Sequence, residues 1–595
     1  MKAPLRFERK DRPDYLAQRV IDAFLREDVR ECISRGAIVS GDAEVLRATR
    51  LDSSPEDSWL RINHFGGALW LAVEPGRFMQ DWRLRALPAL WLHNGEIRYL
   101  FDLPEILACF RERLDNETQS LHLAFAEECA VAAEHRALCE AERARWFGAR
   151  GEEPAIWPQW AKSLARHDRL AAFHDHPFYP TARAKLGFSA DDVRAYTPEF
   201  QPAFDLNWLA VPKSSYEGTP LPEFIRPDFE GVGLNSSLRA DHELMPVHPA
   251  LWQDGLDQFL AQAKLTGSVI RAPGAFLTVL PTLSVRTVAP LACPGLHLKL
   301  PLAIRTLGAS NIRTIKPSTI VDGHVVQTIL RDVTRELPSL SERLLLTDEE
   351  SGATAFRQNF LGFILRRYPV DLNEETVTPV AALAATDSSD QLVAETLTEH
   401  FFQGDVEAFF QEYLDLVLGL HLTLWLKYGI ALESNQQNSL LLFSDGPLRL
   451  MLKDNDAARI RSSVLLQARP DLASRIAVIK DRRIIVDDDL PLAQMFITIT
   501  LQLNIAVLVE ALHMAGRVDR ESLYGRVRAT IAACLDRLAS ENIDVTSAQR
   551  HLLEAERLPL KYLLRAASLE SKAQTGTADV NKYYGVAAPN FLRIT

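Results

Sequence analysis

The sequence is poor in cysteine and carries no excess of positive charge. Its 595 residues include six cysteines, which are scattered and form no C-x-x-C pair. This spacing predicts buried thiols in a reducing compartment and argues against a zinc site or a disulfide framework. The formal net charge of −12 at pH 7 argues against nucleic acid as the main partner, because binding to a phosphate backbone needs a basic face. A local basic pocket for small anions is still compatible with an acidic protein.

Targeting and membrane-spanning segments are also missing from the pattern. The first residues, MKAPLRFERKDRPDY, are too charged for a secretory signal. The most apolar long run, Met495 to Gly516, contains Gln502, Asn504 and Glu510, which are rare in a membrane span. We therefore expect a buried core helix there, and a cytoplasmic protein with no membrane partner.

The common nucleotide-binding and nucleophile motifs are absent as well. The chain has no G-x-x-x-x-G-K-[ST] loop and no G-x-S-x-G element, and Gly231-Val232-Gly233 lacks the third glycine of a G-x-G-x-x-G loop. These absences argue against a P-loop enzyme, a typical protein kinase and a serine hydrolase.

The length and the texture of the chain predict several domains with a mixed α/β (α+β) fold. A chain of 595 residues is too long for a single core. We expect helices in residues 1–172, after a short strand-like patch at Leu69 to Val73, because residues 103–150 are rich in Ala, Glu and Leu. Residues 173–392 have strand and loop texture and end in an acidic segment, 371–392, that is typical of a linker or surface excursion. Residues 393–595 are again mostly helical.

A β-hairpin is predicted within this last region. Two apolar runs, GIALESNQQNSLLLF and LRLMLKD, flank the turn at residues 444–447, whose Asp-Gly pair is a strong hairpin signal. Folding the hairpin would bring Glu433 and Asn438 near Asp454. Oxygen ligands of this kind suit Mg²⁺ bound to the phosphates of a nucleotide, so we interpret the hairpin as the metal end of an ATP site. The alternative is a polar strand end on the surface.

Basic residues alternate with apolar ones in the strand-like runs before the hairpin. They are Arg286, Lys299, Arg305 and Arg313, surrounded by Ser, Thr, Asn and Gly. Alternation places side chains of one parity on one face, and Arg and Lys there suit phosphate or carboxylate oxygens. The alternative is a solvated sheet face with ordinary surface charges; for the whole set, anion binding is favoured.

Two His-Pro turns are the third feature. The run His174 to Gly187 contains His176-Pro177 with aromatic and basic residues, and His248-Pro249 is the second turn. The His-x-His spacing also occurs in metal sites, but further ligands are lacking, so we favour substrate contact over a metal centre.

Taken together, these motifs resemble the NRPS-independent siderophore (NIS) synthetases of the IucA/IucC family, with the ferric iron reductase-like (FhuF-type) segment that they carry at the C-terminus. The resemblance runs from about residue 170 to the end. The S-x-R-T element is intact at residues 284–287, and K-L-x-L at 299–302. H-P-x-H-P-x-x-K-x-R-x-G is echoed at 176–187, with Tyr179 for the second His and with Arg183 and Lys185 exchanged. E-x-H-x-Q-N and R-D-x-x-G are echoed at 433–438 and 453–457, with Asn435 for His and Lys453 for Arg.

By this resemblance, the fold would be a hand-like arrangement with a kinase-like nucleotide-binding hairpin. A thumb (1–172) would precede strand-rich fingers (173–392) and a palm (393–595). The enzyme would adenylate a carboxylic acid, either citrate, a citrate derivative or α-ketoglutarate, with ATP and Mg²⁺. An amine or alcohol would then form an amide or ester, with release of AMP and pyrophosphate. The resemblance also implies a homodimer.

The resemblance assigns roles residue by residue. The catalytic residues would be Arg286, Lys299, Arg313 and His176. ATP would be bound by Ser284, Arg286, Thr287, Lys299, Arg305, Arg313, Asn435, Asn438 and Lys453, with Arg305 and Arg313 competing for one position. The carboxylate substrate would be bound by His176, Tyr179, Arg183, Lys185 and Arg313, and the metal by Glu433, Asn438 and Asp454. Two alternatives are a kinase-like phosphotransferase that uses the same hairpin and a non-catalytic binder of iron–citrate or siderophore.

Overall fold

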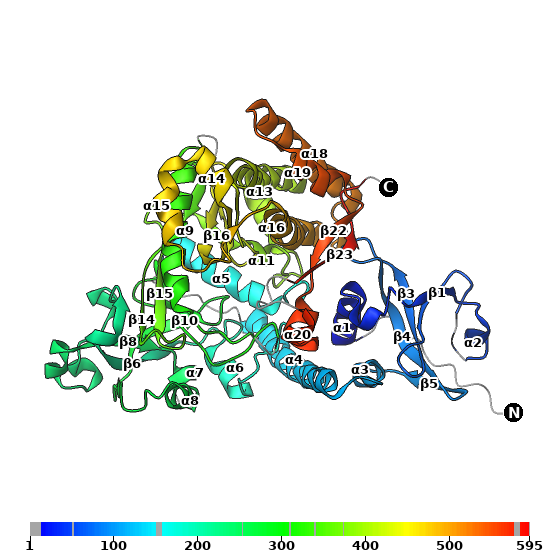
Figure 1. The fold of residues 1–595 in the computed structure, drawn as a ribbon, viewed down its shortest axis with the longest axis horizontal. Coiled ribbons are helices and arrows are strands. Elements are labelled where there is room, and N and C mark those ends of the chain that lie inside the picture. Colours follow the sequence, from blue (N-terminus) through cyan, green and yellow to red (C-terminus); the bar gives the residue numbers. More distant parts are fainter. Residues whose placement is uncertain are drawn as a thin grey trace.

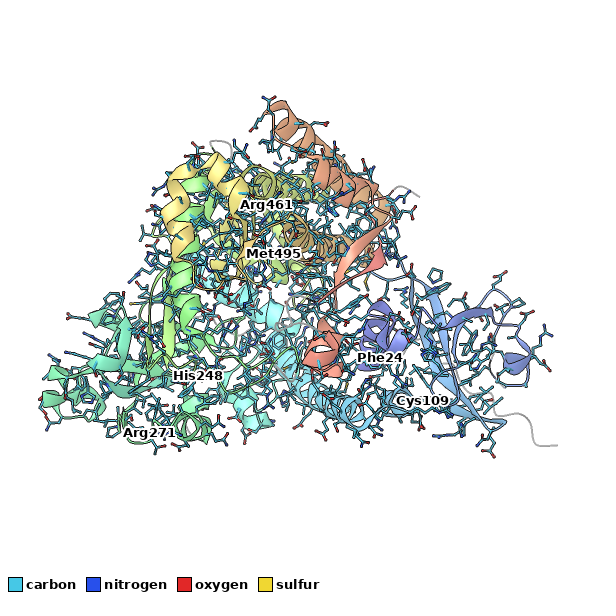
Figure 2. The ribbon with its side chains drawn as sticks, in the orientation of Figure 1. Phe24, Cys109, His248, Arg271, Arg461 and Met495 are labelled. Carbon is cyan, nitrogen blue, oxygen red and sulfur yellow. The ribbon has the colours of Figure 1, made fainter. Side chains whose placement is uncertain are left out.

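The fold was taken from a computed structural model of the chain (Figure 1). It describes residues 14–593 except 50, 52, 150–156, 253, 309–310, 338–340, 373 and 576–582. Most of the charged N-terminal run that argued against a secretory signal therefore lies outside the described residues. Figure 2 shows the side chains, with Phe24 and Cys109 in the N-terminal part and His248 in the central part. All six cysteines are free thiols, and four of them are buried, as predicted.

The N-terminal region contains an antiparallel sheet, of which the sequence analysis anticipated one strand, the patch at Leu69 to Val73. Its five strands follow chain order: β1 (Ala37–Ser40), β2 (Ser58–Ile62), β3 (Ala68–Pro75), β4 (Trp82–His93) and β5 (Glu96–Leu100). Both faces of β3 are buried, since Leu69 and Leu71 face a cluster that includes Phe24 of helix α1 (Tyr15–Arg26), while Trp70 packs against a smaller cluster. Strand β3 confirms the strand-like patch predicted at Leu69 to Val73, whereas the prediction of helices is wrong for the other four strands.

Helices dominate the rest of this region, as predicted. They are α2 (Glu44–Arg47), α3 (Leu103–Arg111), α4 (Asn116–Ala149) and α5 (Gln159–Phe173). Asp102 caps α3, because its side chain accepts a hydrogen bond from the Glu105 backbone N–H at 3.0 Å. The long helix α4 passes beneath the C-terminal segment and connects the N-terminal sheet to the centre of the molecule (Figure 1).

The central region is built on a nine-stranded sheet with the order β7-β14-β15-β12-β11-β10-β6-β8, in which β9 also pairs with β6. Its strands are β6 (Phe204–Pro212), β7 (Tyr216–Gly218), β8 (His242–Val247), β9 (Ile270–Arg271), β10 (Phe276–Pro281), β11 (Thr287–Pro290), β12 (Leu296–Lys299), β14 (Asp348–Ala355) and β15 (Gly362–Arg367). The helices α6 (Ala190–Tyr196), α7 (Pro249–Trp252), α8 (Asp254–Gln262) and α9 (Pro317–Arg335) accompany it. The strand-rich texture predicted for this region is confirmed.

The predicted hairpin is present and belongs to a four-stranded sheet of order β13-β19-β18-β16. Its two strands, β18 (Ser439–Phe443) and β19 (Arg449–Leu452), pair so that Ser439 lies opposite Leu452. The outer strands β13 (Leu344–Leu346) and β16 (Thr376–Pro379) come from the segment assigned to the central domain. A linker at 371–392 is therefore the wrong interpretation, because β16 and the following helix α11 (Val380–Leu383) are largely buried in the core.

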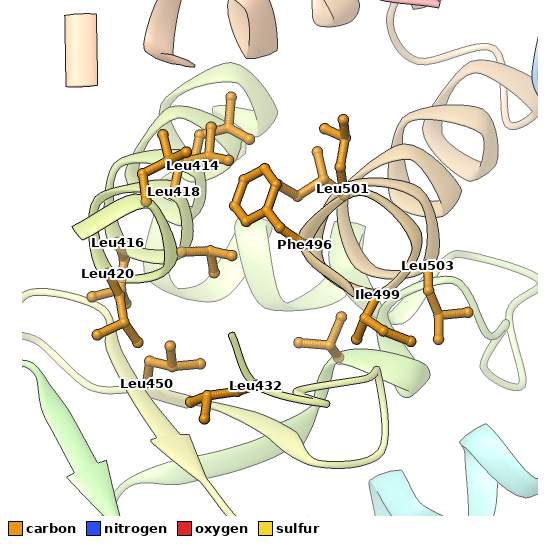
Figure 3. Packing of buried hydrophobic residues seen from close by; sticks show 14 of the residues in the cluster. Leu414, Leu416, Leu418, Leu420, Leu432, Leu450, Phe496, Ile499, Leu501 and Leu503 are labelled. Carbon is orange, nitrogen blue, oxygen red and sulfur yellow. The ribbon is translucent and has the colours of Figure 1, made fainter. Parts of the chain in front are cut away.

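The C-terminal third packs as a helical core behind this sheet. Its helices include α12 (Val393–Phe401), α13 (Val406–Tyr428), α14 (Ser462–Ala468), α15 (Ala473–Val478), α16 (Leu490–Met495), the π-helix η8 (Phe496–Ala506), α17 (Val507–Met514), α18 (Arg520–Ser540) and α19 (Thr546–Ala548). Figure 3 shows Phe496 of η8 facing leucines of α13, with Leu450 of the hairpin sheet below them. The apolar stretch Leu490–Met514 is long enough to cross a membrane but is mostly buried inside the protein, which confirms the predicted core helix.

Short strands complete this third, and its last segment returns to the N-terminal region. The small sheet β17-β20-β21 consists of β17 (Ile430–Ala431), β20 (Arg459–Arg461) and β21 (Ile485–Val486). The hairpin β22 (Arg557–Lys561) and β23 (Tyr584–Pro589) lies between the helical core and α1, beside α20 (Lys572–Thr575) (Figure 1). The C-terminal segment thus packs against the N-terminal region near the centre of the molecule.

Candidate active site

A cavity of about 590 Å³ lies where the central sheet, the hairpin sheet, η8 and β22 meet. This volume falls within the range of about 300–1,000 Å³ that is usual for small-molecule sites. Its wall includes residues 174–178, 283–286, 311–316, 435–438 and 454–457, except 455. Arg286 and Asp454, which the hairpin hypothesis requires to share one cleft, both line it.

The hairpin positions the first group of lining residues. Pairing of β18 with β19 brings their open ends together, so that the Lys453 N–H donates to the Asn438 carbonyl oxygen at 3.1 Å. Asn435 caps the preceding turn, because its Oδ1 accepts from the N–H groups of Gln437 and Asn438 at 3.0 and 3.1 Å. The amide nitrogen of Asn435 has no partner within the described part of the chain, and the residue lines the cavity, so this nitrogen can donate a hydrogen bond to a ligand.

Asp454 is held in the left-handed region, with φ of 59°, by contacts from the central sheet. Its carboxylate accepts from Lys299 of β12, and Arg366 of β15 lies 3.2 Å away. Its backbone N–H donates to Glu349 at 2.9 Å. Burial alone would raise the pKa of Asp454, but the charges of Lys299 and Arg366 outweigh it and hold this pKa well below its usual range. Asp454 is thus an ionised carboxylate in a fixed position, although positive φ is uncommon for a residue with a side chain.

Two guanidinium groups form the basic part of the wall. Arg286 donates to the Thr314 carbonyl oxygen at 2.7 Å, and the Nε of Arg313 contacts the Thr306 hydroxyl. Among the described residues, neither group has an ion-pair partner. Burial, reinforced by the charge of Arg286, lowers the pKa of Arg313 to about 9, so both groups remain charged at neutral pH. Two partly buried, adjacent cations without an ion pair are unfavourable unless an anion binds them.

His176 lies on the other side of the cavity as a neutral donor. Its Nδ1 accepts from the N–H groups of Phe178 and Tyr179 at 3.2 and 3.1 Å, so the proton is on Nε2. Burial lowers the pKa of His176 to about 3, and the charges of Arg19 and Lys561 act in the same direction. The imidazole can therefore donate one hydrogen bond from Nε2, but it adds no positive charge at neutral pH.

The two cations after the His176 turn are already neutralised. Arg183 pairs with Asp175 at 2.8 Å and with Glu199 at 3.0 Å, and Lys185 pairs with Glu199 at 3.0 Å. Burial alone would raise the pKa of Glu199, but these two cations outweigh it and lower that pKa to about 2. Arg183 and Lys185 line the cavity, but their charges are balanced by these carboxylates, and their predicted binding of the carboxylate substrate stays a prediction.

Four other predicted residues lie outside the cavity wall. Tyr179 is completely buried and donates its hydroxyl to Glu128 at 2.8 Å. Thr287 and Lys453 are buried, and Arg305 is exposed. Contact of these four residues with substrate or ATP stays a prediction, and of the two competing arginines only Arg313 lines the cavity.

The second His-Pro turn is also structural. His248 is fully buried, its Nδ1 accepts from the Ala250 N–H at 3.1 Å, and its ring packs against Tyr196 and Phe204. It does not line the cavity, so substrate contact at this turn is the wrong interpretation.

The predicted metal ligands share the cavity but do not form a ready-made cation site. Glu433 lies 3.7 Å from Lys561, and Asn438 donates to the Glu433 carbonyl oxygen at 3.3 Å. Among the described residues, no group of three or more His, Cys, Asp or Glu side chains could hold a metal ion. The oxygen donors Glu433, Asn438 and Asp454 fit Mg²⁺ only where phosphate oxygens complete its shell, which is the usual arrangement for Mg²⁺ on a nucleotide.

Several lining or supporting residues were missed by the sequence analysis. Asp456 and Lys561 line the cavity, and Arg366 and Glu349 support Asp454 from behind. Burial raises the pKa of Asp456 to about 6, with the charge of Asp454 acting in the same direction against that of Lys299. The Lys-Asp-x-Asp spacing at 453–456 was a usable signal for Asp456, whereas nothing near Lys561 indicated a site.

Two protein families and several known proteins are similar in sequence to this chain. Residues 165–385 match the model of the IucA / IucC family, and residues 407–576 match that of the ferric iron reductase FhuF-like transporter. The uncharacterized protein y4xN of Sinorhizobium fredii is 29% identical over 53% of this chain, and the chain spans only 57% of its length. Staphyloferrin B synthase of Staphylococcus aureus is 23% identical, over 70% of this chain and 77% of that protein.

Solved structures show the same fold. The petrobactin biosynthesis protein AsbB of Bacillus anthracis superposes with a TM-score of 0.74 over 97% of this chain and 95% of its own, at 17% identity. ATP-bound aerobactin synthetase IucA of Klebsiella pneumoniae gives 0.70 over 98% and 100%, also at 17% identity. Residues 165–385 are therefore similar to the IucA/IucC family and residues 407–576 to the FhuF-like family, within a fold that AsbB and IucA share.

Proposed function

We propose that this protein is an ATP-dependent ligase of siderophore assembly that joins a carboxylic acid to an amine or alcohol. The carboxylate oxygen attacks the α-phosphorus of ATP and displaces pyrophosphate. The amine or alcohol then attacks the acyl carbon of the adenylate, AMP leaves, and the nucleophile loses a proton. Citrate or a citrate derivative is the favoured acid, with α-ketoglutarate as the other candidate.

The observation that carries this proposal is the unpaired state of Arg286 and Arg313 beside the hairpin carboxylates. Two partly buried cations that form no ion pair with a described residue, although Asp454 is near enough to act on both, suit a polyanion, and guanidinium groups bind phosphate oxygens in a bidentate manner. Asp454 and Asp456 line the same cavity, so cations and carboxylates face one bound molecule. Magnesium triphosphate, which presents both anionic oxygens and a metal, fits this combination better than a simple carboxylate does.

The residues then take the following roles. Arg286 and Arg313 bind phosphate and the acid's carboxylate, and they stabilise charge as pyrophosphate leaves. Ser284 and the Asn435 amide donate further hydrogen bonds. Glu433, Asn438 and Asp454 would hold Mg²⁺, which neutralises phosphate charge when bound. Lys299 fixes Asp454 and adds positive charge to this end.

The acid would extend from this end toward His176. The neutral Nε2–H of His176 can donate to a carboxylate or hydroxyl oxygen. Arg183 and Lys185 are paired with Asp175 and Glu199, so they shape this wall without adding net charge. The hand-like arrangement, the domain limits, the homodimer and the cytoplasmic location stay predictions.

A pyrophosphate-release screen tests the proposal. Full-length protein with Mg-ATP is given citrate, succinate or α-ketoglutarate, each with and without diamines, amino alcohols and amino acids. We expect acid-dependent formation of AMP and pyrophosphate, and a new amide or ester detected by mass spectrometry. Formation of ADP across the whole panel would show a phosphotransferase instead. Tight citrate binding in calorimetry with no effect of Mg-ATP would show a non-catalytic binder.

A further inference from the structure

One wall of the cavity comes from a part of the chain where no motif was recognised. The loop 76–81, here called the Met79 loop, connects β3 and β4 of the N-terminal sheet. Met79 itself is 3% exposed and lines the cavity. Its backbone has φ of 61°, a conformation that costs free energy in a residue with a side chain and that tends to occur at functional sites.

Contacts at both ends hold this loop against the C-terminal part of the chain. Arg77 donates to both carboxylate oxygens of Glu521 at 2.8 and 2.9 Å and to the Phe591 carbonyl oxygen at 2.9 Å. Arg557 of β22 donates to both carboxylate oxygens of Asp81 at 3.1 and 2.6 Å. The loop closes on itself through the Gly76 N–H and the Asp81 carbonyl oxygen at 2.8 Å. Because both ends are fixed, the position of Met79 is set by the fold.

The side chains around Met79 are apolar. Met79 packs with Leu560 and Ala588 of the C-terminal hairpin. The ring of Phe78 lies between those of Phe178 and Phe591, with centroid distances of 5.9 and 5.6 Å. Met79, Phe178 and Leu563 all line the cavity. A carboxylate or phosphate gains nothing from such a wall, whereas a methylene chain does.

A hydrogen-bond acceptor accompanies this apolar wall. Gln502 of η8 donates its Nε2 to the Pro559 carbonyl oxygen of β22 at 2.9 Å, and because a proline carbonyl can only accept, this contact fixes which way the amide points. The Oε1 of Gln502 is buried and has no partner among the described residues, and Gln502 lines the cavity. The wall therefore combines apolar surface with an acceptor that suits an N–H donor.

We propose that the Met79 loop forms the wall against which the alkyl segment of an amine nucleophile packs, and that Met79 sets the length of the amine accepted. This inference rests on the proposed ligase function and adds to it a residue that determines which amine is accepted. An unbranched, flexible methionine suits the role, because it adapts to chains of different length. The N-terminal domain is thereby part of the substrate site.

The test compares diamines of increasing length: ethylenediamine, putrescine and cadaverine. Acid-dependent ATP–pyrophosphate exchange is measured first without amine; its absence from the wild-type protein would overturn the proposed function itself. Amide formation then gives kcat/KM for each diamine in the wild type, Met79→Ala and Met79→Phe. The readout is the ratio of kcat/KM for cadaverine to that for ethylenediamine, so a general loss of activity cancels.

We expect Met79→Ala to raise this ratio about tenfold and Met79→Phe to lower it by a similar factor, in line with the effect of one methylene in an apolar pocket. Met514→Ala is the matched control, since Met514 is 82% exposed, and it should leave the ratio unchanged. Each Met79 variant tests the inference separately, so if one variant fails to fold, the other still gives a result. A folded variant that retains exchange and amide formation with the wild-type ratio would overturn the inference.

Discussion

Two pairs of cations face the same cavity and differ in one respect. Arg183 and Lys185 follow the His176 turn and are neutralised by Asp175 and Glu199. Arg286 and Arg313 form no ion pair with a described residue, and each donates only to an uncharged oxygen. In sequence the two pairs look alike, as basic residues within polar, motif-like runs. The difference shows that a cation's role depends on the carboxylates that the fold brings to it.

The comparison also predicts which cations stabilise the fold and which bind substrate. A buried ion pair loses stability when one partner is removed, because the remaining charge is left without compensation. A buried cation that waits for an anion already carries that cost in the free protein, so its removal should spare stability and abolish binding. The following substitutions sharpen or break this distinction.

The largest effect should come from Arg183→Ala. It leaves Asp175 without its 2.8 Å partner and removes one of the two cations on Glu199, so we expect a loss of about 3–5 kcal/mol in the free energy of unfolding. Urea denaturation measures it. Arg194→Ala is the control, because Arg194 forms an exposed pair with Asp191 and should change stability by less than about 1 kcal/mol. Equal stability of the two variants would break the comparison.

Arg286→Ala should have the opposite profile. We expect adenylation to fall about 10²–10³-fold, as when one donor to a developing charge is removed, with a melting temperature close to that of the wild type. Acid-dependent ATP–pyrophosphate exchange and thermal denaturation give the two numbers. Arg305→Ala is the matched control, since Arg305 is exposed outside the cavity. Unchanged turnover in Arg286→Ala would mean that its charge serves no substrate.

Asp454→Asn tests a carboxylate that forms ion pairs in the free protein and is also a candidate ligand for Mg²⁺. It accepts from Lys299 and Arg366 and is a candidate Mg²⁺ ligand, so we expect a fall in activity of about 10- to 100-fold, as for a weakened metal site. Raised Mg²⁺ should restore part of the activity in a titration at fixed ATP. A large fall in melting temperature with no response to Mg²⁺ would assign Asp454 to the ion-pair network alone.

The smallest effect is expected for Tyr179→Phe. The change removes hydroxyl contacts with Glu128 and Ser568 and should lower the free energy of unfolding by about 1–3 kcal/mol, as for a buried group left unsatisfied. The KM for the acid should not change, because Tyr179 does not line the cavity. A raised KM with unchanged stability would restore the substrate contact that the resemblance implied.

The sequence predicted those parts of the site whose residues lie close together along the chain. The Asp-Gly turn fixed the hairpin, and with it the approach of Asn438 to the chain around Asp454, because hairpin pairing joins residues close in sequence. The S-x-R-T element likewise gave Ser284 and Arg286 on the cavity wall. Alternation in the central region correctly indicated a sheet.

Long-range partners could not be found in this way. Glu199 neutralises Lys185 through a salt bridge that spans an intervening helix, and Arg366 reaches Asp454 from a distant strand. The strand β3 shows no alternation, because both of its faces are buried; its apolar run was still predicted as a strand, whereas the other strands of the N-terminal sheet were taken for helix. The residues next to Met79 and Lys561 in the sequence do not indicate a site. Each of the two residues lines the cavity only because the fold brings the two ends of the chain together.

The pairing of Asp81 with Arg557, which are separated by 476 residues, has a consequence for the order in which the site forms. During synthesis, the segment from Ser284 to Asp456 leaves the ribosome well before β22, so the phosphate-binding side can assemble first. The wall that carries Met79 closes only when the most distant parts of the chain meet, and such contacts form late because closing a long loop costs entropy. In a newly made molecule, the side of the cavity around Arg286 and Asp454 thus forms before the side that carries Met79.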